Sequence, residues 1–123
     1  VILNADQKSI LDLSIELVDI SNRARNKKLK PAELRGGTFT ISSLGGIGGS
    51  FFTPIINPPE VAIIGVSQSV WKNIFNINEK KSELKYIMPF SLSYDHRIID
   101  GAAGARFTKR FKEILDDLSF FKD

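Results

Sequence analysis

The sequence of 123 residues contains one histidine, His96, and the residue types around it are suited to proton transfer. His96 lies between an expected strand and an expected helix, and the carboxylate of Asp100 follows four residues later. A general base needs a pKa near neutrality and a fixed tautomer, and polar neighbours at a strand-to-helix turn can supply both. Taken alone, a single histidine is more often a surface or core residue, so its spacing leaves both interpretations open. Asp100 could equally cap the helix that begins at Gly101.

Several other kinds of chemistry find little support in the residues. The absence of cysteine excludes a disulfide framework, a thiolate metal site and a cysteine nucleophile. One histidine builds a zinc site only if carboxylates supply nearly every ligand, so we expect no metal. The glycine-rich run from Leu44 to Ser50 is not a dinucleotide-binding turn, because Phe51 replaces the third glycine and Pro54 prevents the following helix.

The composition indicates one globular domain without a membrane span. Hydrophobic residues make up 42% of the sequence and charged residues 25%, and the apolar runs are far shorter than the ~20 residues of a spanning helix. The net charge of +3 is mild, and the basic cluster from Arg23 to Lys30 suits a solvated helix end. It has no interleaved aromatic residues, so we expect no nucleic-acid partner. The first residues, Val1–Asp6, lack the features of a signal peptide and read like a strand entered midway.

The candidate functional residues are expected to lie on a fold of two helices and four strands. Apolar periodicity predicts a helix from about Asp6, which could cap it, to about Lys28, with Pro31 stopping it. Alternation predicts a strand over Thr38–Ser42, so that Ser42 lies at a strand end. Without further information, Ser42 and Ser43 are best explained as partners of backbone groups before a glycine turn.

The central strands of the sheet are expected in the second half of the chain. The apolar run Glu60–Ser67 is typical of a strand buried on both faces, and strands over 70–77 and 84–93 follow around a polar tip at 78–82, although Pro89 disfavours regular pairing. Helical spacing over Gly101–Leu118 closes the chain, with an apolar face that includes Phe107, Phe111 and Leu118. Together these elements predict one α+β unit with a sheet of at least four strands.

Two motifs resemble a known family. The segment His96-Arg97-Ile98-Ile99-Asp100-Gly101 is similar to the His-x-x-x-Asp-Gly signature of dihydrolipoamide acyltransferases and chloramphenicol acetyltransferases. Upstream, Gly36–Gly45 and Ile55–Ile63 resemble the dihydrolipoamide acyltransferases almost word for word and the chloramphenicol enzymes much less. The likeness extends over essentially the whole chain.

This resemblance implies a fold and a role for each site residue. It implies a partial chloramphenicol acetyltransferase-like fold, a mixed sheet with flanking helices, in which residues 1–123 form the C-terminal part of the catalytic domain without lipoyl or peripheral-subunit-binding domains. By resemblance, His96 is the general base, Ser42 donates its hydroxyl to the transition-state oxyanion, and Asp100 supports the active-site turn without transferring a proton. A preplaced oxyanion donor of this kind contributes about 3 kcal/mol.

The resemblance also implies a reaction and partners. An acyl group, acetyl by the likeness to pyruvate-complex members, would move between the dihydrolipoyl arm and coenzyme A, with the lipoyl group carried on a separate domain and no metal. Trimers, in which one subunit's histidine works with groups of its neighbour, would build a cubic or icosahedral core. Lipoyl domains, the decarboxylase and dihydrolipoyl dehydrogenase would be partners, in the cytoplasm of a bacterium or in the mitochondrial matrix of a eukaryote.

Two alternatives stay open at this point. The chain could be a non-catalytic assembly module of such a complex, although relatives of that kind tend to lose the histidine. It could also be another coenzyme A-dependent acetyltransferase of the chloramphenicol type, against which the Gly36–Ser42 and Ile55–Pro59 segments argue. The chain alone is expected to be a poor enzyme although it holds both candidate catalytic residues, and to associate, because two helices cannot cover the predicted sheet.

Overall fold

The computed structural model describes residues 1–121, which form two compact units. The first unit comprises Val1–Thr38 and the chain from Arg110 onward, and the second comprises Phe39–Lys109. The boundary between them falls within the last helix, α2 (Gly101–Asp116). All three residues to which the sequence assigns a chemical role lie in the second unit, so that unit positions the candidate site.

The first unit contains helix α1 (Ile10–Arg25), which begins later than the sequence predicts. Its N-terminal cap is Ser9, whose Oγ accepts a hydrogen bond from the backbone N–H of Asp12 (3.1 Å). The prediction that Asp6 caps this helix is wrong, because Ala5–Gln7 form a separate 3-10 turn, η1, and the backbone is extended at Lys8 before the helix starts.

The C-terminal end of α1 is also earlier than predicted. The helix ends at Arg25, since Lys27 adopts a left-handed conformation with φ of 55°, and Pro31 opens a second 3-10 turn, η2 (Pro31–Leu34), instead of stopping the helix. Arg23 in the last turn of α1 forms an ion pair with Glu33 of η2. One member of the basic cluster is therefore used to tie the helix to the turn that follows it.

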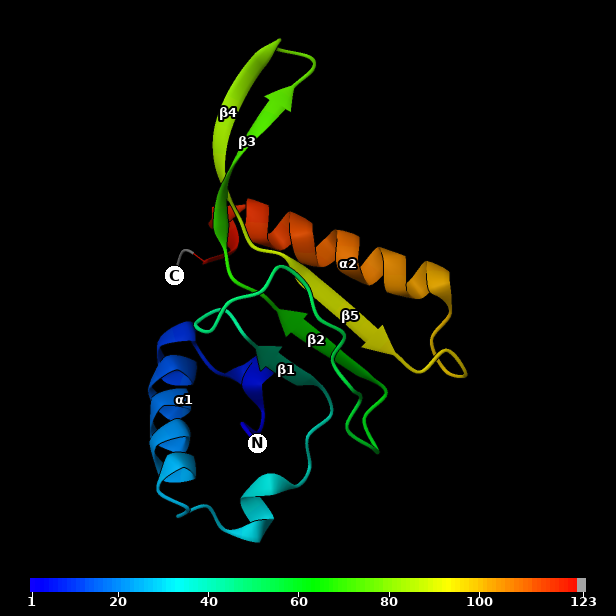
Figure 1. Cartoon of the computed structure of the whole chain (residues 1–123). Helices are drawn as coiled ribbons and strands as arrows, with labels where there is room; N and C mark the ends of the chain where they lie inside the picture. The colour runs from blue at the N-terminus through cyan, green and yellow to red at the C-terminus, as the bar shows by residue number, and fades with distance from the viewer. Residues whose placement is uncertain (122–123) are drawn as a thin grey trace. The chain divides into compact units, whose positions relative to one another are not determined.

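The second unit is built on a mixed sheet of three strands, as Figure 1 shows. Strand β2 (Ala62–Val66) lies in the middle, parallel to β1 (Thr40–Ser43) on one side and antiparallel to β5 (Phe90–Tyr94) on the other. The prediction that the apolar run is buried on both faces is confirmed, because four consecutive residues of β2 are buried and Ile64 is only 2% exposed. This strand is the core of the unit.

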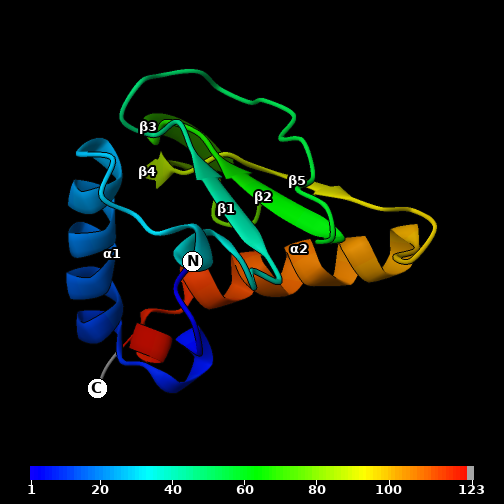
Figure 2. The same cartoon turned by 90° about the horizontal axis from the view of Figure 1, so that it is seen from below.

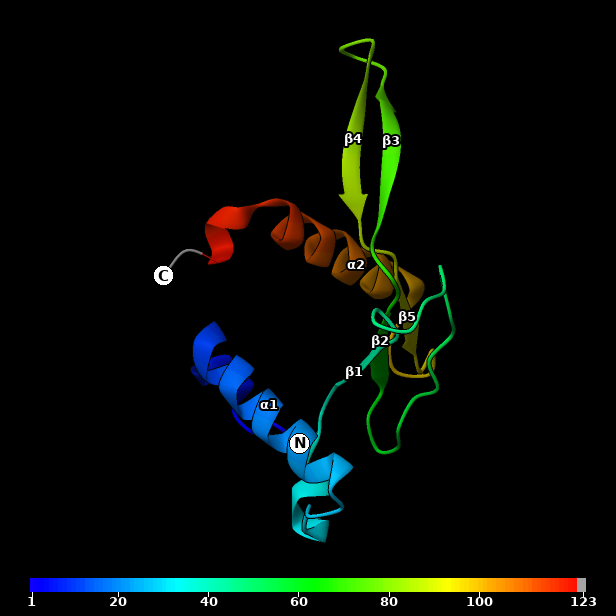
Figure 3. The same ribbon diagram turned by 60° about the vertical axis from the view of Figure 1, so that its left-hand side comes forward.

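A separate hairpin of β3 (Val70–Asn76) and β4 (Lys81–Ile87) projects away from that sheet (Figures 1 and 3). The prediction of one strand over 84–93 and of one sheet with at least four strands is wrong. The chain leaves the hairpin at Ile87 and enters the main sheet at Phe90, and the Pro89 between them has no N–H to donate to a ladder. Its carbonyl oxygen instead accepts a hydrogen bond from the Ser67 N–H (3.0 Å).

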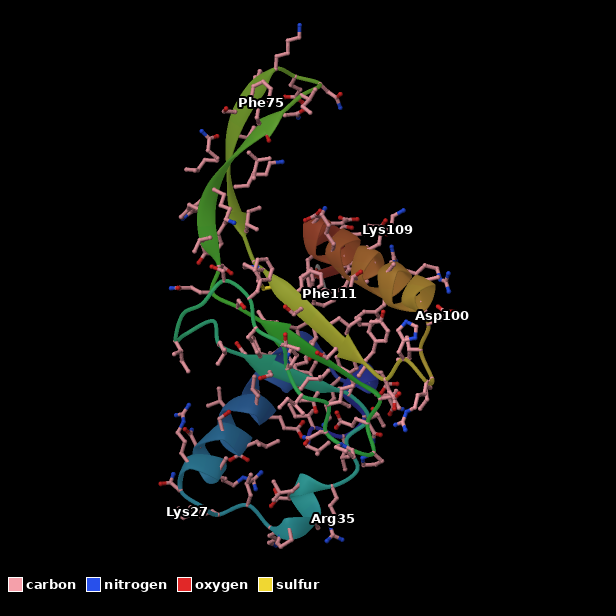
Figure 4. The ribbon with its side chains drawn as sticks, turned by 45° about the vertical axis from the view of Figure 1, so that its right-hand side comes forward. Lys27, Arg35, Phe75, Asp100, Lys109 and Phe111 are labelled. Atoms are coloured by element: carbon pink, nitrogen blue, oxygen red, sulfur yellow. The ribbon has the colours of Figure 1, made fainter. Side chains whose placement is uncertain are left out.

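One face of the hairpin carries large apolar side chains. Trp71 lies directly opposite Tyr86, their ring centroids are 5.0 Å apart, and Leu84 and Phe75 continue the same face by the alternation of strand residues. Trp71 is 64% exposed and Phe75 is 60% exposed. Phe75 lies near the far end of the hairpin in Figure 4. These side chains therefore contribute little to the core of the unit.

Helix α2 follows the sheet, and its beginning lies on one face of the three strands (Figure 2). The rings of Phe107 on α2 and Phe39, just before β1, are 5.9 Å apart. The helix ends at Asp116 and not at Leu118, because Asp117 accepts hydrogen bonds that open a further 3-10 turn, η3 (Leu118–Phe121). The predicted packing of the Leu118 side chain lies outside the described part of the chain. No helix within residues 1–121 is long and apolar enough to cross a membrane.

The loop between β1 and β2 covers the other face of the sheet. Gly48 and Gly49 have φ values of 131° and 96°, which favour glycine, and confirm the special geometry that the sequence predicts for this loop. Further along, the ring of Phe52 lies directly on Gly65 of β2. A Cβ atom on Gly65 would be 2.7 Å from Cζ of Phe52, closer than van der Waals contact permits. Glycine at position 65 thus lets the loop pack directly against the sheet.

We therefore predict that Gly65→Ala destabilises the protein by about 1–3 kcal/mol, because the added methyl group overpacks a buried site. Chemical denaturation monitored by Trp71 fluorescence and circular dichroism would measure the change. Gly46→Ala is the matched control, since Gly46 has an ordinary φ and no atom lies within 4 Å of the place of its Cβ atom. Equal stability of the two variants would contradict the prediction.

Candidate functional site

His96 lies in an open groove of about 600 Å³ in the second unit. One wall is the loop before β2, with Ile56, the prolines at 58 and 59, and Val61, and the other is the turn from Tyr94 to Ile98. The groove thus combines apolar walls with a charged and titratable turn. Within residues 1–121 no three histidine, aspartate or glutamate side chains gather in a way that could hold a metal ion.

The turn that carries His96 is held by the backbone of Asp95. The N–H of Asp95 donates to the carbonyl of Val61 (2.8 Å), which fastens the turn to the start of β2. The carbonyl of Asp95 accepts from the N–H groups of Ile98 (3.0 Å) and Ile99 (2.9 Å), which closes the turn before α2. His96 is therefore displayed from a short, hydrogen-bonded turn and not from a free loop.

The side chains of Asp95 and Arg97 form an ion pair across this turn. Nη2 of Arg97 lies 2.7 Å from Oδ2 of Asp95, Nε lies 2.9 Å from Oδ1, and the backbone N–H of Arg97 also donates to Oδ1 (3.0 Å). The Arg97 side chain, and then its backbone N–H, lower the pKa of the Asp95 carboxyl from 3.8 to about 2. Because Arg97 is engaged with Asp95, neither residue is placed to take the proton of a substrate.

The imidazole of His96 is exposed to solvent and lies beside an aromatic ring. The centroids of the His96 and Tyr94 rings are 5.7 Å apart, at an interplanar angle of 33°. No hydrogen bond joins the imidazole to another side chain or to the backbone within the described residues. A ring that is open to the groove and not engaged by the protein can meet a substrate proton.

Asp100 lies at the start of α2, where Figure 4 labels it. Its Oδ1 accepts a hydrogen bond from the backbone N–H of Ala103 (2.6 Å), so the prediction that it caps the helix is confirmed. No hydrogen bond joins its carboxylate to His96 in the described chain. The observed role of Asp100 is therefore to cap the helix, and its support of an active-site turn stays a prediction.

Ser42 is half-buried on β1, level with Gly65 of β2 and Ser91 of β5. Residues directly opposite each other project from the same face, so Ser42 lies on the face that carries Phe52. Its hydroxyl makes no hydrogen bond within the part of the chain that the structure describes. Ser43, in contrast, accepts a long hydrogen bond from the Gly45 N–H (3.4 Å), as expected of a structural residue.

The structure does not bring Ser42 and His96 of one chain together. Tyr94 pairs with Ala62, three residues along the sheet from the row that contains Ser42. Three residues of about 3.3 Å and two strand spacings of about 4.8 Å separate the backbones of Ser42 and Tyr94 by roughly 14 Å. His96 lies two residues beyond Tyr94, and Ser42 is not part of the groove that contains it. The two residues lie toward opposite ends of the sheet.

Sequence reasoning missed two residues that shape the site, Tyr94 and Gly104. A Cβ atom on Gly104 of α2 would lie 2.8 Å from Cε1 of Tyr94, so the tyrosine ring rests on bare helix backbone. The sequence held one signal for each of these residues. Tyr94 and His96 are two residues apart, as neighbours on one side of an extended chain are, and Gly104 interrupts a run of alanines inside a helix where glycine is unfavourable.

The ion pair predicts a specific response to Arg97→Gln. The pKa of Asp95 should rise from about 2 toward 3.8, because the variant loses the side-chain hydrogen bonds that stabilise the carboxylate. The stabilisation of the folded state by this pair is present above pH 3.8 and is lost as the pH falls through about 2, so the variant should be less stable than the wild type above pH 3.8 and equally stable below about pH 2. NMR titration of the Asp95 carboxyl carbon would measure the shift. In Lys85→Gln, which breaks the separate pair with Glu83, the Asp95 value should stay near 2, and an unchanged value in Arg97→Gln would refute the assignment.

Comparisons with known proteins agree on one family. The model of the family described as 2-oxoacid dehydrogenases acyltransferase (catalytic domain) matches residues 1–121. Two bacterial relatives are the dihydrolipoyllysine-residue acetyltransferase components of pyruvate dehydrogenase complexes from Pseudomonas aeruginosa and Azotobacter vinelandii. They are 52% and 51% identical to this chain over 96% of its length. The chain spans 21% and 18% of the lengths of these relatives.

Solved structures show the same likeness. The chain matches Azotobacter vinelandii dihydrolipoamide acetyltransferase, studied for the roles of a serine, a histidine and an asparagine in catalysis, with a TM-score of 0.90 and 50% identity. It matches the cubic core of the pyruvate dehydrogenase multienzyme complex with a TM-score of 0.90 and 49% identity. Each of these two matches covers 96% of this chain and 48% of the solved chain. These matches confirm the predicted fold class and the resemblance. The chain belongs to the acyltransferase catalytic-domain family of the 2-oxoacid dehydrogenases.

Proposed function

We propose that this chain carries the histidine half of an acyltransferase site that moves an acetyl group between a dihydrolipoyl arm and coenzyme A. The observation that carries the proposal is His96, exposed in a groove on a hydrogen-bonded turn, within a chain of this family. The names of the relatives, which are acetyltransferase components of pyruvate dehydrogenase complexes, support acetyl as the acyl group.

In the proposed reaction the neutral imidazole of His96 removes the proton from the thiol of coenzyme A. The thiolate forms a bond to the carbonyl carbon of the acetyl-lipoyl thioester, and negative charge collects on the carbonyl oxygen. Collapse of this intermediate breaks the bond to the lipoyl sulfur, which takes the proton from the imidazolium. A thiol with a pKa of about 8.5 needs only modest help at neutral pH, so one base and a groove that aligns the two substrates can supply most of the acceleration.

The oxyanion donor is Ser42 of another copy of the chain. Its hydroxyl on a strand is suited to donate a hydrogen bond to a developing charge, yet in one chain Ser42 does not line the groove that contains His96. A site assembled from His96 of one copy and Ser42 of the next satisfies both observations. The match to a cubic core, an oligomeric assembly, supports this arrangement.

The remaining parts of the proposal follow from the family. Residues 1–123 would form the C-terminal part of a catalytic domain, and the match to about half of each solved chain supports this. Coenzyme A and a lipoyl group on a separate domain would be the substrates, trimers would build the core, and lipoyl domains, a decarboxylase and dihydrolipoyl dehydrogenase would be the partners. A bacterial cytoplasm would be the location, as the bacterial relatives suggest.

We predict that the oligomeric enzyme containing this chain transfers acetyl from acetyl-coenzyme A to dihydrolipoamide, and that His96→Ala lowers kcat by at least ~10²-fold with little change in fold. A thiol-acetylation assay and circular dichroism would measure both. Lys72→Ala, a substitution at an exposed position of the hairpin, is the control for effects of mutation and purification that are unrelated to the site. Near-normal turnover of His96→Ala, or a wild-type enzyme that acetylates chloramphenicol alone, would refute the proposed function.

Ser42→Ala should lower kcat with little effect on either KM, because its hydroxyl acts on charge that develops in the transition state. If the site is shared between copies, mixing Ser42→Ala with His96→Ala subunits should restore activity, since about one quarter of the interfaces would pair an intact serine with an intact histidine. Mixing His96→Ala with the double variant is the matched control and should restore none. Failure of the first mixture to recover, with proven subunit exchange, would place both residues in one chain's site.

A further inference from the structure

The ring of Tyr94 lies beside both helix α2 and the imidazole of His96. On one side its centroid is 5.7 Å from that of His96. On the other side it meets the first turns of α2, where a Cβ atom on Gly104 would be 2.8 Å from Cε1, 2.9 Å from Cζ and 3.1 Å from the hydroxyl oxygen of Tyr94. The tyrosine ring therefore touches the helix with one part and the candidate base with another.

Contact with Tyr94 explains why residue 104 is glycine. Gly104 lies inside α2 without a positive φ, so its backbone conformation is open to any residue. Glycine in a helix interior costs up to about 1 kcal/mol relative to alanine. The neighbouring positions 102, 103 and 105 are all alanine, the residue with the highest helix propensity. Gly104 is also the buried residue of α2. The absence of a side chain at residue 104 lets the Tyr94 ring pack directly against the backbone of α2.

Packing is also what orients the imidazole. Within the described residues the ring of His96 makes no hydrogen bond, and Nε2 lies 3.9 Å from the place of a Cβ atom on Gly101. A base that is not fixed by hydrogen bonds depends on the surfaces beside it, which here are the Tyr94 ring and the bare start of α2. A misplacement of about 1 Å in a reacting group can cost as much as 10²-fold in rate.

We infer that Tyr94, seated against Gly104, is a positioning residue that holds the imidazole of His96 for proton transfer. The inference rests on the proposed function, since it assigns to Tyr94 the placement of the proposed base. Gly104 takes part by leaving room: a methyl group there would displace the ring, and the ring would then no longer support His96 in the same place.

The test compares Gly104→Ala with the wild type in the oligomeric enzyme. We expect kcat to fall by about 10- to 100-fold, while both KM values change by less than about twofold, because binding surfaces are retained and alignment is lost. NMR gives a second readout that does not depend on activity. His96 is the one histidine of the sequence, and the ring-current shift that Tyr94 imposes on its ring protons should change in the variant.

Gly46→Ala is the matched control, because no atom lies within 4 Å of the place of its Cβ atom, and it should leave kcat and the His96 signals unchanged. Tyr94→Leu, which removes the ring and keeps an apolar side chain, should reproduce both effects and serves if Gly104→Ala does not fold. Unchanged His96 signals, or changed signals with normal kcat, would overturn the inference. A wild-type enzyme that transfers no acetyl group would instead refute the proposed function.

Discussion

Hydrogen bonding of β2 to a strand on each side is the constraint on which the rest of the second unit depends. Its parallel partner carries Ser42, and its antiparallel partner leads into His96, so one strand fixes the distance between the two candidate groups. The N–H of Asp95 is bonded to Val61, at the start of the same strand, so the turn that displays His96 is an extension of the ladder. A shift of register at β2 by one residue would move Ser42 to the other face of the sheet.

Much of this arrangement is visible in the sequence because periodicity and motifs are local signals. The apolar run around Ile64 predicts the buried strand, and the segment from His96 to Asp100 predicts the turn and the helix cap. The sequence does not predict that the strand expected over 84–93 divides between two sheets, since alternation continues through Met88 and Pro89 and partner choice is a long-range property. It also does not show that Ser42 and His96 face apart, because that depends on strand order.

The unit uses the same packing device twice. Phe52 rests on Gly65 beside Ser42, and Tyr94 rests on Gly104 beside His96. In both places an aromatic ring meets bare backbone, so that a large flat surface is brought closer than any side chain would allow. These ring contacts lie beside the two candidate groups, neither of which makes a hydrogen bond of its own within residues 1–121.

The hairpin also has a consequence for the order of folding. Paired residues of β3 and β4 are between 5 and 17 residues apart along the chain, whereas those of β1 and β2 are 23 apart and those of β2 and β5 are 24 to 32 apart. Local pairs close at a smaller entropy cost and form first. Once Val70 meets Ile87, the chain between Val66 and Phe90 is effectively a short loop. If the hairpin closes first, it shortens the loop that joins β2 to β5 and lowers the entropy cost of pairing those two strands.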